Sequence, residues 1–554
     1  FHPVKKENHA DNTIFGSKGF WMGGMYMAQI HVANLTFCYE GSFDPVFENV
    51  SFSVDTDWKL GFIGRNGKGK TTFLNLLLGK YSYSGSISTP ALFDYFPYSI
   101  SEQQMNRCAS DFIDELKPGC EEWRIICELA KLDVSAELLY RPFKTLSHGE
   151  RTKVLLAVLF AGENDFLLID EPTNHLDQGS RETIKRYLKE KKGFILVSHD
   201  RDLLDACIDH VLVLNRQSIE VQSGNFSSWW ENKNRRDHFA KMENEKHLKE
   251  IASLKKAADQ SGHWAQKNEN TKIGYDPIKE PDRPTRAYIG GKTKKMQKRV
   301  KQYEQRMERE IQAKEGLLVD LETPVSLKLN PLSYHKERLL YGRDLNIGYE
   351  GRNELVLKNF SFELQRGERV FLHGKNGCGK STWIKTILEM NRKNLKKDQD
   401  GRNSFYYEGE ESDKCHKNKA EIVISGELQV GSGLTISYIN QDTDFLKGRI
   451  REFCEKQELE ESLFCALLRQ LDMDRVQFSK NMEEFSEGQK KKVLIAASLM
   501  TPAHLYIWDE PLNYIDVFSR MQIEELLLAF QPTMLLVDHD IRFQEKIGTR
   551  VVVF

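Results

Sequence analysis

The feature that most constrains this chain is an internal repeat. The first copy holds four landmarks, which are GRNGKGKT at 64–71, LSHGE at 146–150, FLLIDEP at 166–172 and LVSHD at 196–200. The second copy holds them in the same order, as GKNGCGKS at 374–381, FSEGQ at 485–489, LYIWDEP at 505–511 and LLVDHD at 535–540. The spacing also agrees, because 21 positions separate Gly149 from Asp170 and Gly488 from Asp509. We therefore expect two tandem domains of the same architecture.

Each copy opens with the pattern G-x-x-x-x-G-K-[ST], placed between a β-like apolar run and a helix-like segment. Glycines let the backbone N–H groups of such a loop curl around phosphate oxygens, and the following helix presents its positive N-terminus. Lys70 and Lys380 would neutralise the β- and γ-phosphates, while Thr71 and Ser381 would offer hydroxyls to Mg²⁺. The predicted ATP-binding residues are Gly64, Asn66, Gly67, Gly69, Lys70, Thr71, Thr72, Gly374, Asn376, Gly377, Gly379, Lys380, Ser381 and Thr382.

Carboxylates and histidines supply the chemistry for hydrolysis. Asp170 and Asp509 each end an apolar run typical of a fully buried strand, and they would hold Mg²⁺. The glutamates that follow, Glu171 and Glu510, would act as general bases on the attacking water. His199 and His539 come 29 and 30 positions after the aspartates, and each could contact the γ-phosphate and the water. The pattern predicts an α/β ATPase with ATP and Mg²⁺ as its ligands.

Composition changes divide the rest of the chain. We expect domains at 27–228 and 326–554, a linker at 229–325, and a leader at 1–26 outside the fold. Within the linker, 230–258 and 298–318 are helix-like, and 259–291 holds three prolines and a Gly-Gly pair, which predicts a long helical hairpin. A plain spacer between domains is the alternative. The charged stretch 391–421, which is absent from the first copy, is expected to be a surface loop.

The linker carries a concentrated positive charge in a chain whose net charge is only −2. Eight basic residues lie between 283 and 301, and no acidic residue lies between Asp282 and Glu304. A basic cluster with interleaved aromatic residues at the far end of an extended element suits contact with RNA, although a solvated surface is the simpler alternative. The candidate RNA contacts are Arg283, Arg286, Tyr288, Lys292, Lys294, Lys295, Lys298 and Arg299.

Composition excludes several other classes of protein. With 40% hydrophobic and 29% charged residues, the chain is neither disordered nor collagen-like. Its apolar runs fall far short of the roughly 18 residues that a membrane span needs. The nine cysteines form no C-x-x-C pair, which favours reduced thiols inside the cell.

Taken together, these motifs resemble the ATP-binding-cassette pattern, and LSHGE and FSEGQ resemble its signature motif. The resemblance implies two tandem ABC-type P-loop NTPase domains that pair head to tail within one, monomeric chain. Site one would then combine Lys70, Thr71, Asp170, Glu171 and His199 with Ser486 and Gly488. Site two would combine Lys380, Ser381, Asp509, Glu510 and His539 with Ser147 and Gly149. Tyr39 and Tyr349 would stack on adenine, and Gln441 would contact Mg²⁺ and water.

Two cassettes joined by a charged helical hairpin resemble the ABC-F proteins, and DEPTNHLD at 170–177 supports this. The segments GNFSSWW at 224–230 and RPTRAYIGG at 283–291 look like the Lsa-type antibiotic-resistance branch. The resemblance implies a cytoplasmic, ribosome-associated factor whose hairpin reaches 23S rRNA and the P-site tRNA through the tRNA exit site. It would displace lincosamides, streptogramin A and pleuromutilins from the peptidyl-transferase centre. The alternatives are a housekeeping ABC-F translation factor and, more remotely, the ATP-binding subunit of a membrane transporter.

The sequence departs from the family pattern at four positions. Tyr98 stands where the first cassette should have its Gln, and His148 replaces a Gly of the first signature. In the second copy, Leu512 and Tyr514 replace the Thr and His of the DEPTNH run. Both sites keep Lys, Asp, Glu and His, so we expect both to hydrolyse ATP, at unequal rates.

Overall fold

The computed structural model describes most of the two repeats and part of the segment between them. The described residues are 28–39, 45–162, 165–174, 176–215, 218–270, 294–295, 298–299, 301–303, 305–307, 309–310, 329–351, 354–375, 377–397 and 422–554. The expected leader at 1–26 and the candidate RNA contacts Arg283, Arg286, Tyr288 and Lys292 lie outside this part of the chain.

The first domain contains two sheets. An antiparallel sheet of order β2-β1-β4 is built from β1 (Gln29–Phe37), β2 (Phe47–Asp55) and β4 (Ser84–Ser88). The central sheet has the order β5-β6-β7-β3-β8-β9, from β5 (Leu92–Phe96), β6 (Asp165–Asp170), β7 (Phe194–Val197), β3 (Lys59–Gly64), β8 (His210–Leu214) and β9 (Ile219–Ser223). Only β9 pairs antiparallel in the central sheet, so the carboxyl ends of β3, β6 and β7 meet at one edge.

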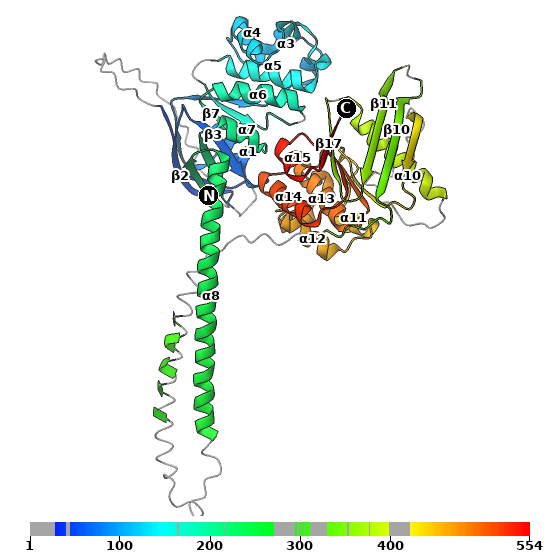
Figure 1. The fold of residues 1–554 in the computed structure, drawn as a ribbon. Helices are drawn as coiled ribbons and strands as arrows, with labels where there is room; N and C mark the ends of the chain where they lie inside the picture. Colours follow the sequence, from blue (N-terminus) through cyan, green and yellow to red (C-terminus); the bar gives the residue numbers. More distant parts are fainter. Residues whose placement is uncertain are drawn as a thin grey trace, which may run out of the picture.

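Helices flank the central sheet and form a separate group at one end of the domain (Figure 1). Beside the sheet lie α1 (Lys70–Leu77), α6 (Gln178–Glu190) and α7 (Arg201–Cys207). The separate group contains α2 (Glu102–Met105), α3 (Ala109–Leu116), α4 (Glu122–Lys131) and α5 (His148–Phe160). Ser147 begins α5 with a capping box, because its hydroxyl accepts from the N–H of Glu150 while the Glu150 carboxylate accepts from the N–H of Ser147.

The second domain repeats this plan. Its antiparallel sheet has the order β11-β10-β13, from β10 (Arg338–Tyr349), β11 (Leu355–Gln365) and β13 (Ile422–Val430). Its parallel sheet has the order β14-β15-β16-β12-β17, from β14 (Ile436–Ile439), β15 (Leu505–Asp509), β16 (Met534–Val537), β12 (Arg369–His373) and β17 (Arg550–Val553). The helices are α10 (Lys380–Lys397), α11 (Ile450–Lys456), α12 (Glu461–Gln470), α13 (Glu487–Met500), α14 (Val517–Phe530) and α15 (Ile541–Ile547). The prediction of two tandem α/β domains is confirmed.

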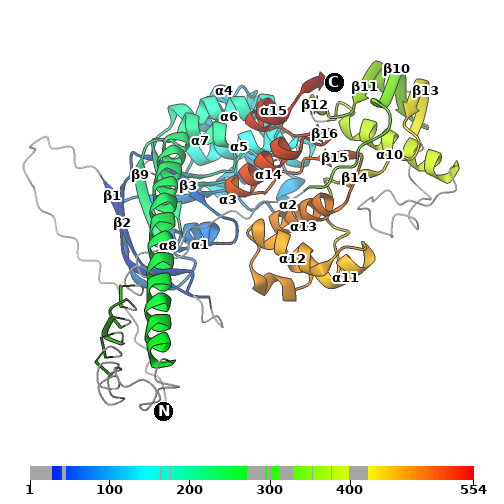
Figure 2. The same ribbon diagram turned by 60° about the horizontal axis from the view of Figure 1, so that its bottom comes forward.

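The segment between the domains begins with one long helix, α8 (Phe226–Asn270), which projects away from both domains (Figures 1 and 2). The described residues within 294–310 are helical and lie beside α8 in both views. The prediction of a turn from 259 onward is wrong in its first twelve residues, since α8 continues to Asn270. The reason is local, because 259–270 contains no proline and its single glycine costs only about 1 kcal/mol.

The expected surface loop at 391–421 is also wrong at its start. Residues 391–397 form the last turns of α10, and Asn391 is fully buried. The side-chain amides of Asn391 and Asn394 donate to the carbonyls of Leu434 and Val430, at 3.2 Å each. These bonds fasten the polar end of the helix to the neighbouring sheet, and hydropathy alone does not reveal them. The remainder, 398–421, lies outside the described residues.

Candidate ATP-hydrolysis sites

The two P-loops lie between a central strand and the helix that follows it, as predicted. Gly69 and Gly379 have left-handed backbones, with φ of 106° and 107°. A Cβ at Gly69 would lie 2.6 Å from Val46 Cγ1, and one at Gly379 would lie 2.9 Å from side-chain atoms of Val356 and Leu357. Only glycine fits where the loop passes this close to the antiparallel sheet. Asn376 lies outside the described residues.

The P-loop lysines fold back over their own loops. The Nζ of Lys70 donates to the carbonyl of Gly64 at 2.6 Å and to Asn66 Oδ1 at 3.2 Å. The Nζ of Lys380 donates in the same way to the carbonyls of Gly374 at 2.7 Å and Lys375 at 3.0 Å. Both ammonium groups are therefore held at the place where phosphate oxygens would lie against the loop.

The predicted metal ligands meet in pairs. Thr71 Oγ1 donates to Asp170 Oδ2 at 3.1 Å, and Ser381 Oγ donates to Asp509 Oδ2 at 3.2 Å. Burial raises the pKa of Asp509 to about 6, and it also raises the pKa of Asp170. A hydroxyl beside a buried carboxylate suits the binding of a small hard cation. The positive charge of such a cation would favour the ionised form of the carboxylate. These four residues would hold Mg²⁺, which would neutralise phosphate charge when bound.

The predicted catalytic glutamates follow directly, on strained backbone. Glu171 and Glu510 have φ of 49° and 47°, and their N–H groups donate to Val197 and Val537 of the next strand at 2.9 Å. This turn aims both carboxylates at the histidines, because Glu171 Oε1 lies 3.3 Å from His199 Nε2 and Glu510 Oε1 lies 3.8 Å from His539 Nε2. A side chain so placed at the P-loop edge can polarise a water.

Both histidines are neutral near pH 7. Burial, followed by the positive charges of Arg181 and Lys380, lowers the pKa of His539 to about 4. Burial and Lys70 place the pKa of His199 well below its usual value. A neutral imidazole offers one N–H and one acceptor, which suits a group that positions both water and phosphate.

The surroundings of the two glutamates differ. Gln441 Nε2 and Asn513 Nδ2 each donate to Glu510 Oε2 at 2.8 Å. In the first domain Tyr98 occupies the position of Gln441. Phe96, two residues before Tyr98, pairs with the residue that precedes Asp170. Ile439, two residues before Gln441, pairs in the same way with the residue that precedes Asp509. Tyr98 instead donates to Asp94 Oδ2 at 2.7 Å, pointing away from the site. Glu171 Oε1 is buried and accepts no hydrogen bond from any described residue. Burial and Asp170 raise the pKa of Glu171 to about 8.

The predicted adenine-stacking tyrosines stand beside the P-loop helices. The Tyr39 hydroxyl lies 2.6 Å from Thr72 Oγ1, and the Tyr349 hydroxyl lies 3.0 Å from Thr382 Oγ1. Tyr39 remains 44% exposed, so its ring keeps surface on which a base could stack. Their role in binding adenine stays a prediction.

Site one is assembled across the two domains. Gly488 of the second signature packs so closely that a Cβ there would lie 2.5 Å from the carbonyl of Tyr514 and 3.2 Å from Asn66 Nδ2. Asn66 Nδ2 donates to that same carbonyl at 2.6 Å. Ser486 begins α13 with a capping box, next to this contact. The structure therefore brings the second signature to the first P-loop.

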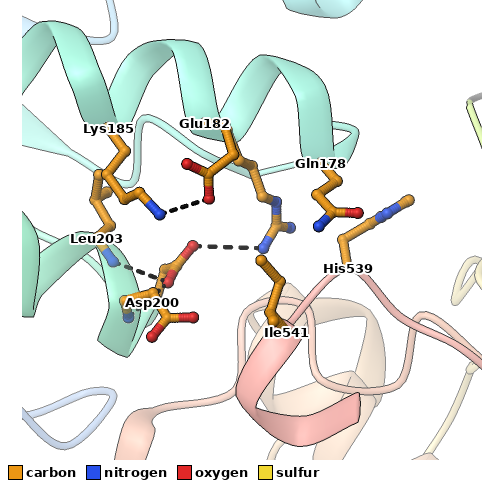
Figure 3. A pocket seen from close by; sticks show the side chains of 9 residues that line it. Gln178, Glu182, Lys185, Asp200, Leu203, His539 and Ile541 are labelled. Atoms are coloured by element: carbon orange, nitrogen blue, oxygen red, sulfur yellow. Dashed lines mark hydrogen bonds and ion pairs between the residues drawn. The ribbon is translucent and has the colours of Figure 1, made fainter. Parts of the chain in front are cut away.

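Site two is open by comparison. A Cβ on Gly149 would meet Ser180 and Leu176, both of its own domain. A cleft of about 480 Å³ separates Gln178, at the start of α6, from His373, which precedes the second P-loop. Figure 3 shows a second, smaller pocket nearby, where Gln178 at the start of α6 lies beside His539, and Lys185 pairs with Glu182 of the same helix. Within the described residues, the expected completion of site two by Ser147 and Gly149 is not formed.

Four interactions at these sites were not foreseen from the sequence. Tyr95 donates to Asp170 Oδ2 at 3.2 Å, and Asn513 holds Glu510. Arg65 Nη1 lies 2.7 Å from Asp472 Oδ1, and Lys68 Nζ lies 3.3 Å from Asp474 Oδ2, so two P-loop side chains bind the opposite domain. The positive charges at the variable positions of the P-loop could have indicated the pairs of Arg65 and Lys68. Their partners could not be identified, because they lie about 400 residues away.

Comparison with known proteins agrees with this geometry. The family model described as "ABC transporter" matches residues 47–174 and 357–513, which is just over half of the chain. The chain therefore belongs to the ABC transporter family, and it is an ATPase with two nucleotide-binding domains. Among the described residues, we find no helix with the length and apolar character needed to cross a bilayer.

Relatives that match over nearly the whole chain are also known. "Ribosome protection protein VmlR" of Bacillus subtilis (strain 168) is 27% identical over 518 residues, covering 92% of this chain and 84% of that protein. "ATP-binding protein Uup" of Buchnera aphidicola is 26% identical, covering 94% and 79%. The archaeal ribosome recycling factor aABCE1, solved in complex with stalk protein aP1, shares the fold with a TM-score of 0.55 at 17% identity, covering 94% and 87%. The two sequence relatives support the ABC-F resemblance and the solved structure supports the fold, while the Lsa-type branch stays a prediction.

Proposed function

We propose that this protein is an ABC-F-type factor that acts on the ribosome and is switched by ATP. The observation that carries the proposal is the combination of a site closed between two domains with a helix of 45 residues that projects from them. At 1.5 Å per residue this helix is close to 70 Å long, which far exceeds what a connection between two adjacent domains needs.

The surface of the linker supports a nucleic-acid partner. The described residues Lys294, Lys295, Lys298 and Arg299 are all exposed. Positive charge at this density releases counterions when it meets phosphate, so the affinity would fall steeply with salt. The similarity of the chain to a protein named as a ribosome protection protein also supports a nucleic-acid partner. We further propose that the protein works in the cytoplasm and that its hairpin reaches the tRNA exit and P-site region of the ribosome. There it would displace antibiotics of the peptidyl-transferase centre, of the lincosamide, streptogramin A and pleuromutilin type.

The proposed switch requires that the ribosome bind the closed state more tightly than the open state. The double variant Glu171→Gln with Glu510→Gln should bind ATP, fail to hydrolyse it and co-sediment with ribosomes. Its matched control is Glu190→Gln with Glu525→Gln, two exposed glutamates on α6 and α14. A double variant that stays in the supernatant with ATP present would refute the proposal.

A housekeeping translation factor of the same family is the second candidate, favoured by the similarity to Uup. Drug susceptibility of a host that expresses the full chain separates the two. We expect raised inhibitory concentrations for the three drug classes, and their loss when Lys294, Lys295, Lys298 and Arg299 are all changed to alanine. Ribosome binding without any change in susceptibility would identify the housekeeping factor.

A further inference from the structure

The base of the projecting helix α8 is packed against the second domain through aromatic rings. Trp229 and Trp230 of α8 meet Phe518, the second residue of α14, while Phe226 packs against both tryptophans, and we call these four residues the aromatic joint. The ring centroids of Trp229 and Trp230 lie 6.1 Å and 5.9 Å from that of Phe518, and the rings of Phe226 and Trp230 are stacked at 6.4 Å. Such pairs stabilise a contact beyond the effect of the area that they bury.

Two cationic side chains lie close to the ring of Phe518. Lys233 of α8 places its Nζ 4.8 Å from the centroid of Phe518, and also 5.5 Å and 5.8 Å from Trp229 and Trp230. Arg65 of the first P-loop places its Cζ 6.0 Å from the same ring. One side chain of the second domain therefore touches both the phosphate-binding loop of site one and the root of the projecting helix.

The joint is continuous with the core of the first domain. Phe226 and Trp229 are buried in that core, and Val517 of α14 is buried in the same cluster although it belongs to the second domain. Phe518 and Met521 pack against this cluster from outside. The first turn of α14 thus behaves as part of the first domain, and it can leave only by exposing large aromatic surfaces.

A polar contact accompanies the aromatic one. Arg542 of α15 donates to Asp205 Oδ2 of α7 at 2.7 Å, and Asp205 in turn accepts from the N–H of Ser227 in the first turn of α8, also at 2.7 Å. Asp205 of α7 therefore connects the second domain to the same end of α8.

The start of α14 is also a wall of site one. Tyr514 accepts from Asn66 of the P-loop, and Asp516 caps α14 while it pairs with the buried Lys492 of the signature helix at 3.0 Å. Only one residue separates Asp516 from Phe518. A displacement of this segment when site one opens must therefore move Phe518 relative to Trp229 and Trp230.

The equivalent segment of the first domain lacks these features. The residues that follow Asp177 are Gln178 and Gly179, where the second domain has Val517 and Phe518. Gln178 lines the open cleft beside His373 instead of entering a core. The aromatic connection to α8 thus exists on the side of site one, and the described residues of the equivalent segment in the first domain form no aromatic counterpart.

We propose that the aromatic joint makes the orientation of α8 depend on closure of site one, with Phe518 as the positioning residue. This inference concerns the regulation of the proposed function and rests on it for its biological meaning. Closure by nucleotide presses the start of α14 against the base of α8 and stiffens the helix where it leaves the domain. Opening withdraws Phe518 and lets the helix swing. Nucleotide at site two lacks this aromatic route, and its link to the helix is the polar contact of Arg542, three residues after His539, with Asp205.

Hydrogen exchange on the full-length chain tests this without ribosomes, so its failure is distinguishable from failure of the proposed function. The chain is compared with and without Mg²⁺ and a non-hydrolysable ATP analogue. We expect the analogue to slow exchange both at the first P-loop, 64–78, and at the base of α8, 226–240. In Phe518→Ala the slowing at the P-loop should persist, while the slowing at α8 should fall by at least roughly threefold, as expected when the aromatic pairs of Phe518 with Trp229 and Trp230 are lost from a local opening equilibrium.

Two further variants decide between coupling and simple packing. Trp230→Ala removes the α8 side of the contact and should give the same selective loss. Phe530→Ala lies at the far end of α14, is 39% exposed, and should leave both responses unchanged. The proposal is overturned if α8 shows no nucleotide response in the unmodified chain, or if Phe518→Ala retains the full response. It is also overturned if Phe518→Ala and Trp230→Ala lose the P-loop response in equal measure, since the joint would then only hold the domains together.

Discussion

The two ATP sites are built from the same motifs but are finished differently. In site one the opposite domain is already in contact, through Asn66 with Tyr514 and through Arg65 with Asp472. In site two the catalytic Glu510 is the better oriented of the two glutamates, since Gln441 and Asn513 both hold it. The comparison teaches that closure between the domains and orientation of the catalytic side chain are separate properties. Site one has the closer contact between domains, and site two has the better-oriented glutamate.

The helix of the signature motif reinforces this division. In the second domain Lys491 of α13 is buried, and its Nζ donates to the carbonyls of Asn440 and Gln441 at 2.9 Å each. These bonds fix the loop that carries the Gln441 side chain. The corresponding residue of the first domain is Thr152, whose hydroxyl bonds within its own helix to His148. The loop of Tyr98 lacks this cationic support, which is consistent with its side chain turning toward Asp94.

The largest effect is expected from changing one catalytic glutamate at a time. A positioned general base contributes roughly 10²- to 10⁴-fold to a rate. If site two carries most of the turnover, Glu510→Gln should reduce steady-state ATP hydrolysis by roughly tenfold or more, while Glu171→Gln should reduce it by less than about twofold. Phosphate release under saturating ATP measures both. Equal losses would show that the better orientation of Glu510 has no kinetic consequence.

The next effect concerns the side chain that orients each glutamate. Gln441→Tyr copies the first domain into the second and removes one of the amides that hold Glu510. We expect roughly a tenfold loss of hydrolysis, in line with about 1.5 kcal/mol, the lower end of the range for a hydrogen bond to a charged group. The reciprocal change, Tyr98→Gln, is measured in the Glu510→Gln background and should raise the residual rate a few-fold. If Tyr98→Gln lowered the rate of hydrolysis instead, the hydrogen bond from Tyr98 to Asp94 would matter more than an amide that orients Glu171.

A further effect concerns the ion pairs that close each site. Arg65 and Lys68 face Asp472 and Asp474, whereas the equivalent positions at site two are Lys375 with Asp133 and Cys378 with Ser135. Asp133 pairs with Arg186 of its own domain instead. Site two can therefore form at most one of the two pairs, and we expect it to be the site that opens first.

A short bismaleimide can detect this difference. Lys68→Cys with Asp474→Cys should cross-link to a measurable extent even without nucleotide and gain only modestly from it, because these two residues are in contact in the structure. Ser135→Cys, paired with the native Cys378, should cross-link several-fold more when ATP and Mg²⁺ are added. Mass spectrometry of the linked peptides distinguishes these products from those of the other cysteines. Nucleotide-independent linkage at both sites would contradict the asymmetry.

The smallest effect concerns the contact that supports closure of site one. Asp474 is 65% exposed, and its pair with Lys68 is long, so it contributes little. Asp474→Asn should weaken ATP binding to site one by less than about threefold, whereas Asp472→Asn, at a shorter and more buried pair, should weaken it more. Nucleotide titration in the Glu171→Gln with Glu510→Gln background measures both. Equal effects would indicate that these pairs act only through the overall charge.

The sequence alone determined the two-domain α/β architecture and the local chemistry of each half-site. P-loops, carboxylates and histidines are contiguous motifs, and the geometry of strand, turn and helix places them within a few ångströms of each other, as at Thr71 with Asp170 and Ser381 with Asp509. Tertiary structure decided where those halves meet. The bonds from Asn66 to Tyr514 and from Arg65 to Asp472 join residues more than 400 positions apart. Periodicity and spacing along the chain carry no information about such contacts, because they depend on how two folded surfaces dock. The aromatic joint arose in the same way, since Trp229 and Phe518 are ordinary core residues until packing makes them neighbours.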